Sequence, residues 1–173
     1  MRAYKTICKK GGLTMEGSPP TPPAICNCLA LRQAARRVTQ FYDRVLAPSG
    51  VRATQFSILA VIGQAPEITM KDIAREMVLD RATLGHNLRP LIAQGFVALR
   101  VGADRRQRPL TLTRRGAARL RQTKRLWRAA QATFEHTFGS ADAASLRGVL
   151  AEVASLDFEH PAHSPDKVEK RFR

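Results

Sequence analysis

The sequence predicts a mainly α-helical chain: a winged helix-turn-helix with an α/β wing, plus N- and C-terminal helices that form a dimerisation domain. Three observations predict this class. Apolar residues recur at helical spacing through most of residues 27–158. Residues 96–113 change to the pattern of a β-hairpin. Thirteen basic residues, against one acid, lie between Arg81 and Arg128, which indicates a surface for phosphates.

The first helix is expected over about residues 27–47, where apolar side chains recur every three or four positions until Pro48. A second helix is expected over about 54–64. Thr69 is a candidate cap for a short third helix, and Asp80 for a fourth. The fourth helix is closed by Gly95, and four of its side chains are expected to face inward: Leu84, Leu88, Leu91 and Ile92.

The hairpin and two long helices complete the folded part. Strands are expected over 96–101 and 110–113, joined by a polar, basic loop. Helices are expected over about 114–137 and 141–158. The first of these carries a stripe of apolar side chains that we interpret as core or dimer interface, made of Leu120, Trp127, Phe134 and Phe138.

The expected domain organisation has three parts. Residues 1–24 are rich in proline and glycine, and we expect them to be disordered. Residues 25–158 form the folded domain, with a winged-helix core at about 52–113 and dimerisation helices at about 27–47 and 114–158. Residues 159–173 are expected to be a C-terminal tail.

The composition limits the partners and the compartment. The chain has 173 residues and a net charge of +15, which favours a polyanionic partner. No run of eighteen apolar residues is present, and the basic start lacks the apolar segment of a secretory signal. Three cysteines do not make a disulfide framework. We therefore expect a cytoplasmic protein with no membrane partner.

The fourth helix and the hairpin loop carry the candidate DNA-binding residues. An α-helix fits the major groove, where arginine pairs with guanine and asparagine with adenine. An arginine of the wing loop can enter the adjacent minor groove, and Asp104 is expected to hold one such arginine in position. A solvated charged face is the alternative interpretation. The candidates are Arg81, Thr83, His86, Asn87 and Arg89 on the helix, and Arg105, Arg106 and Arg108 on the wing.

Five segments together resemble the MarR family of bacterial transcriptional regulators: TQFSIL at 54–59, DRATLGHNLRPL at 80–91, GFV at 95–97, DRR at 104–106 and LTRRG at 112–116. The resemblance implies a homodimer on a pseudo-palindromic operator, usually a repressor released by a small molecule or an oxidant. It also implies an effector cleft, for which Phe41 and Trp127 are candidate lining residues. His86 departs from the family, which often carries arginine or another long polar residue there.

The cysteines suggest a redox sensor. Cys26 and Cys28 begin the first helix, and a helix N-terminus favours the thiolate that peroxides oxidise. The spacing from Cys28 to Tyr42 is similar to that of the organic-hydroperoxide-sensing branch of the same family. A second expected tyrosine is Arg32 here. The alternative is that these cysteines are inert, and Cys-x-Cys alone supplies too few ligands for a metal site.

Two other functions are compatible with parts of the sequence. A non-specific nucleic-acid-binding or nucleoid-type protein would use the basic block without sequence preference, although an aromatic content of 6% argues against recognition by base stacking. An enzyme is not expected, because the sequence has no Cys-x-x-Cys, no glycine-rich phosphate loop and no paired carboxylates in the basic region. No cofactor is expected.

Overall fold

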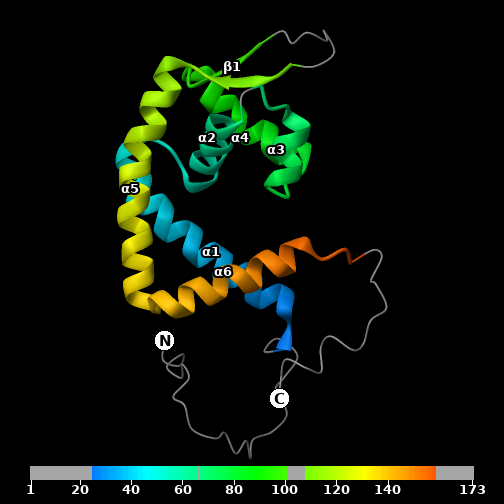
Figure 1. The fold of residues 1–173 in the computed structure, drawn as a ribbon, viewed down its shortest axis with the longest axis vertical. Coiled ribbons are helices and arrows are strands. Elements are labelled where there is room, and N and C mark those ends of the chain that lie inside the picture. Colours follow the sequence, from blue (N-terminus) through cyan, green and yellow to red (C-terminus); the bar gives the residue numbers. More distant parts are fainter. Residues whose placement is uncertain (1–24, 66, 101–107, 159–173) are drawn as a thin grey trace, which may run out of the picture. The chain divides into compact units, whose positions relative to one another are not determined.

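The computed structural model describes residues 25–65, 67–100 and 108–158, and is mainly α-helical with one small hairpin (Figure 1). The chain divides into two compact units after Arg37. Residues 27–37 of α1 belong to the first unit and are described separately from the rest. The elements are α1 (Asn27–Leu46), η2 (Ala47–Ser49), α2 (Ala53–Gln64), α3 (Met70–Glu76), α4 (Arg81–Ala93), β1 (Val97–Leu99), β2 (Leu110–Leu112), α5 (Arg114–Phe138) and α6 (Ser140–Ser155).

The starts of α3 and α4 confirm both caps expected from the sequence. The Thr69 hydroxyl accepts a hydrogen bond from the Asp72 backbone N–H at 3.2 Å. The Asp80 carboxylate accepts from the Thr83 backbone N–H at 2.8 Å. Each cap satisfies a backbone donor that the first helical turn leaves unpaired.

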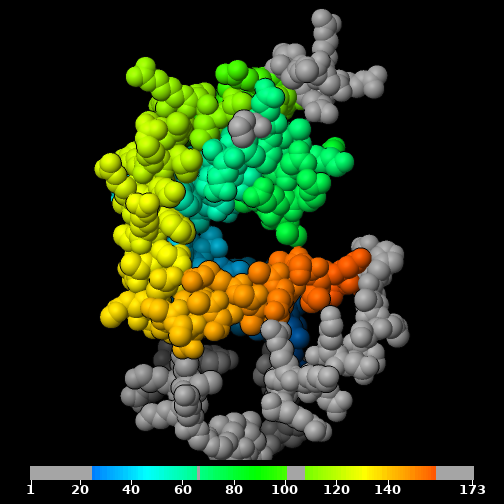
Figure 2. Space-filling view, in the orientation of Figure 1, coloured from blue at the N-terminus to red at the C-terminus, as the bar shows by residue number. Residues whose placement is uncertain are grey.

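The core lies among α2, α3, α4 and the hairpin, whose surfaces pack closely in the space-filling view (Figure 2). Leu59, Ile73, Leu84 and Leu110 are fully buried, one from each of these elements. Because four short elements share these side chains, none of them is stable without the others. The core therefore holds the outer face of α4 in a fixed position beside the hairpin.

The hairpin is antiparallel, with Val97 opposite Leu112 and Leu99 opposite Leu110. Thr113 fastens it to α5: its hydroxyl donates to the Gly95 carbonyl at 2.6 Å and accepts from the Gly116 N–H at 3.0 Å. A Cβ at position 116 would collide with the carbonyl oxygen of Phe96. Only glycine allows this close approach between α5 and the base of the hairpin.

Several sequence-based boundaries need correction. Ile92 is 36% exposed and does not face inward, because it lies one position past Leu91 and the helical rotation turns it toward solvent. The strands are three residues each, and α6 ends at Ser155 instead of about 158. Pro48 does not simply end the first helix, since it belongs to a short 3₁₀ helix that closes at Gly50.

Within the described ranges, no single helix is long and apolar enough to cross a membrane. One bent pair, Asn27–Ser49 with Ala53–Gln64, reaches that length and composition only when the two are taken together, and its bend is 71°.

Candidate nucleic-acid interface and adjoining pocket

The outer face of α4 combines exposed cationic side chains with polar side chains that are hydrogen-bonded to groups of the same helix or its N-cap. Arg81 and Arg89 are exposed and His86 is accessible, opposite the buried leucines of the same helix. Thr83 donates its hydroxyl proton to Asp80 at 2.6 Å, so it serves the N-cap. The Asn87 side-chain amide donates to the Thr83 carbonyl at 2.9 Å. The arginines are therefore available to a partner, whereas Asn87 would have to exchange a hydrogen bond within the helix.

The N-cap also has an electrostatic signature. The hydrogen bond from the Thr83 side chain, followed by backbone N–H groups of the first turn, lowers the pKa of Asp80 below its ordinary value. The charged carboxylate is thus the favoured form in the fold, where it faces the positive end of the helix dipole. A negative charge at this end fixes the start of α4 without occupying the face that carries Arg81 and Arg89.

The wing is described only at its base. Asp104, Arg105 and Arg106 lie outside the described residues. Arg108, two positions after Arg106, is exposed, and the Arg100 N–H donates to the Pro109 carbonyl at 2.9 Å across the two strand ends. The two ends of the basic loop are therefore held next to each other by backbone pairing at the base of the hairpin.

Two arginines of the basic block have structural contacts that the sequence did not reveal. The Arg119 guanidinium donates to the Ser49 carbonyl at 2.6 Å and lies 5.2 Å from the centre of the Phe96 ring. Arg115 lies 5.4 Å from the centre of the same ring. Such cation–π contacts stabilise the junction of α5 and the hairpin.

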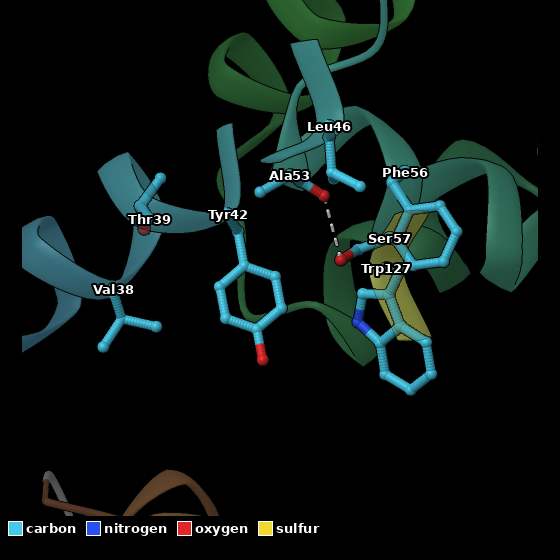
Figure 3. A pocket seen from close by; sticks show the side chains of 8 residues that line it. All are labelled: Val38, Thr39, Tyr42, Leu46, Ala53, Phe56, Ser57 and Trp127. Atoms are coloured by element: carbon cyan, nitrogen blue, oxygen red, sulfur yellow. Dashed lines mark hydrogen bonds between the residues drawn. The ribbon is translucent and has the colours of Figure 1, made fainter. Parts of the chain in front are cut away.

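An open pocket of about 240 Å³ lies beside this core (Figure 3). The rings of Phe56 and Trp127 are stacked with centres 5.9 Å apart and form one wall. Hydroxyl groups complete a lining that contains no charged side chain. The lining residues are Val38, Thr39, Tyr42, Leu46, Ala53, Phe56, Ser57 and Trp127. Of the two residues predicted to line an effector cleft, Trp127 lines this pocket, and the Phe41 ring packs edge-on against Tyr42, which also lines it. That the pocket is an effector cleft stays a prediction.

Tyr42 links this pocket to α6 through a chain of hydrogen bonds. Its hydroxyl donates to the Gln131 side-chain oxygen at 2.6 Å, the Gln131 amide donates to Glu135 at 3.0 Å, and Arg147 donates to the same Glu135 oxygen at 3.0 Å. Burial, reinforced by the nearby Glu135 charge, raises the pKa of Tyr42. The tyrosine is thus held as a neutral donor. The sequence singled out Tyr42 for its spacing from Cys28 and gave no sign of this hydrogen-bond chain.

The two cysteines at the start of α1 are both exposed, and neither forms a disulfide. The Leu29 N–H donates to the Cys26 sulfur at 3.4 Å, so this thiol occupies the capping position of the helix. No group of three metal-ligating side chains is found among the described residues.

These features define a class of protein. Three short helices, the last with an arginine-bearing outer face, precede a β-hairpin with a basic loop, which is the arrangement of a winged helix-turn-helix DNA-binding protein. The MarR family model matches residues 49–107, from the last residue of η2 to the loop between β1 and β2. With the similarity to a solved member described next, this shows that the chain belongs to the MarR family of DNA-binding transcriptional regulators.

Solved structures give the same result. The M. tuberculosis transcriptional regulator MosR, crystallised in complex with DNA, is 40% identical to this chain; the match covers 76% of this chain and 99% of MosR with a TM-score of 0.62. The repressor CouR bound to a 23-mer DNA duplex shares the fold at 24% identity, 80% and 99% coverage, and a TM-score of 0.71. MarR from E. coli shares it at 23% identity, 75% and 97% coverage, and a TM-score of 0.61. A search of curated protein sequences finds no match.

Proposed function

We propose that the protein is a homodimeric, sequence-specific transcriptional repressor that binds a pseudo-palindromic operator in the bacterial cytoplasm. The exposed arginine face of α4, held by a buried core beside a basic hairpin, is the observation that carries this proposal. Arg81, His86, Asn87 and Arg89 contact base edges or phosphates, and Thr83 orders the helix start.

The wing supplies the second contact. Arg105, Arg106 and Arg108 reach the minor groove beside each major-groove contact, and Asp104 orients one of them. Two copies related by a two-fold axis would set the two α4 helices about 34–36 Å apart, one turn of DNA. The crystal structure of MosR with DNA, at 40% identity, supports duplex DNA as the partner.

The test compares binding of an operator duplex of about 30 bp, selected from a random library by the wild-type protein, with binding of a scrambled duplex at fixed salt. Asn87→Ala should weaken operator binding by about 1–3 kcal/mol and relax one base position. Arg105→Ala should weaken both duplexes and reduce the salt slope by about 0.9 per lost phosphate contact. Arg44→Ala, which removes an equal charge from exposed α1 surface, is the control and should change neither.

Equal affinity of the wild-type protein for operator and scrambled duplex would indicate a non-specific nucleoid-type protein. An Asn87→Ala variant with unchanged affinity and footprint would remove that residue from the recognition face.

The pocket beside Trp127 is proposed as the effector site. Its aromatic wall and uncharged hydroxyl groups suit a small apolar ligand with a hydrogen-bonding group. A ligand there releases DNA only if it binds more tightly to a conformation that cannot span both half-sites. Trp127 is the only tryptophan of the chain, so its fluorescence reports binding directly. An effector that dissociates the operator complex without changing this fluorescence would exclude the pocket.

Oxidation of Cys26 or Cys28 is a second proposed route to release, supported by the exposure of both thiols. A hydroperoxide would convert one thiolate to a sulfenic acid, releasing the alcohol, and a second thiol would then displace water to form a disulfide. A role for Tyr42 beside the thiol stays a prediction and requires its hydroxyl to leave Gln131. A Cys26→Ser/Cys28→Ser variant should keep DNA binding in cumene hydroperoxide, whereas the wild type should lose it; equal behaviour of the two proteins would end the sensor proposal.

A further inference from the structure

The turn between α3 and α4 contains a residue in an unfavourable conformation. Val78 has a φ of 51°, in the left-handed region. Its N–H donates to the Arg75 carbonyl at 3.3 Å, and the next N–H, of Leu79, donates to the Ala74 carbonyl at 2.8 Å. These two hydrogen bonds define a Schellman motif, in which the left-handed residue is usually glycine.

The end of α4 provides a comparison within the same chain. There the Gly95 N–H donates to Ile92 at 2.8 Å, the Phe96 N–H donates to Leu91 at 2.9 Å, and Gly95 has a φ of 69°. The two helices thus end in the same motif, once with glycine and once with valine. Glycine adopts this backbone without steric cost, whereas a β-branched side chain is strained in it.

The valine side chain is mostly exposed, so its burial contributes little to the stability of the fold. Val78 is 73% exposed, while its neighbours Met77 and Leu79 are partly buried. An exposed isopropyl group in a strained backbone opposes folding on both counts. A strained residue whose apolar side chain is exposed is a candidate for a contact with a partner outside the folded chain.

The position of Val78 indicates what that contact is. It precedes Asp80, the N-cap of α4, by two residues, so at most about 7 Å of backbone separates it from the helix start. With the N-terminal part of α4 in the major groove, as proposed above, Val78 lies at the edge of that groove. The apolar group that base pairs present there is the 5-methyl of thymine.

We propose that Val78 is a specificity-determining residue, whose isopropyl group packs against the 5-methyl group of one thymine in each operator half-site. This proposal rests on the proposed function. It assigns to the turn before α4 an apolar contact of a kind that the arginines and Asn87 of the helix do not make, because these side chains read hydrogen-bonding groups.

The test uses the selected operator and a set of duplexes in which each thymine is replaced singly by uracil. For the wild type, one uracil substitution per half-site should lower affinity about five- to tenfold. Val78→Gly should bind the unmodified operator about five- to tenfold more weakly and lose sensitivity at that position only. The same variant should melt about 2–4 °C higher, because glycine relieves the strain.

Glu67→Gly is the matched control. Glu67 is the other non-glycine residue with positive φ in the described ranges, at 61°, and it is exposed. This variant should also melt higher but keep the wild-type uracil profile. A wild type that ignores every uracil substitution, or a Val78→Gly variant with unchanged operator affinity, would overturn the inference. Failure of the wild type to distinguish operator from scrambled DNA would instead overturn the proposed function.

Discussion

At the scale of single residues, the arginines of the site are of two kinds. Some are exposed and accessible to a partner, and others make contacts that hold the fold together. Arg81 and Arg89 of α4 are exposed, whereas Arg119 of the same basic block is bonded to the Ser49 carbonyl and lies on the Phe96 ring. The sequence does not distinguish the two kinds of arginine, because the density of charged residues along the chain does not show tertiary contacts. The close approach at Gly116 was hidden for the same reason: it depends on Phe96, about twenty residues earlier.

Gly116 offers a direct test of that approach. Gly116→Ala should destabilise the protein by about 3 kcal/mol or more, since the new methyl group collides with backbone and not with a flexible side chain. Gly148→Ala is the control: its new methyl group in α6 would have no neighbour within 4 Å, so the substitution should stabilise by up to about 1 kcal/mol. Urea denaturation of both variants measures the difference, and equal stability of the two would contradict the described junction of α5 and the hairpin.

At the scale of elements, local sequence signals predicted where the helices lie. They predicted poorly which other elements each helix face packs against. The caps at Thr69 and Asp80 were readable because a cap depends on residues within one turn. Ile92 was assigned to the wrong side because periodicity does not show where a helix leaves the core. The pocket needed three-dimensional information, since Tyr42, Ser57 and Trp127 come from three helices.

The cap at Asp80 predicts a dependence on pH. Because the Thr83 hydrogen bonds lower the pKa of Asp80 from its ordinary value of 3.8, its contribution to stability is full above that pH and is lost as pH falls through the lowered value. Asp80→Asn keeps a capping oxygen but cannot titrate. Melting temperatures from about pH 7 to about pH 2 should fall less steeply for this variant than for the wild type, and parallel curves would remove the charge effect.

At the scale of the whole molecule, the terminal helices present apolar side chains that the described part of the chain leaves exposed. Phe138, Val149 and Leu150 are 44%, 52% and 41% exposed on α5 and α6. In the proposed dimer a second copy covers this face, as the resemblance to the family implies. A dimer would present two α4 helices, one to each half-site. Its affinity for a palindrome would then exceed its affinity for a single half-site by far more than twofold.

Leu150→Asp tests whether this face holds two copies together. A charge there should shift the protein from dimer to monomer in sedimentation velocity, while circular dichroism shows unchanged helix content. Ser145→Asp adds the same charge at another exposed position of α6 and should remain dimeric. A dimeric Leu150→Asp variant would move the interface elsewhere.

The most direct test of the central claim is sedimentation equilibrium of the wild-type protein with the selected operator and with its scrambled counterpart, at about 150 mM salt. A dimer that recognises its operator should bind as two copies per operator duplex, with an affinity for the scrambled duplex at least about a thousandfold lower. One copy per duplex, or the same affinity for both sequences, would contradict it.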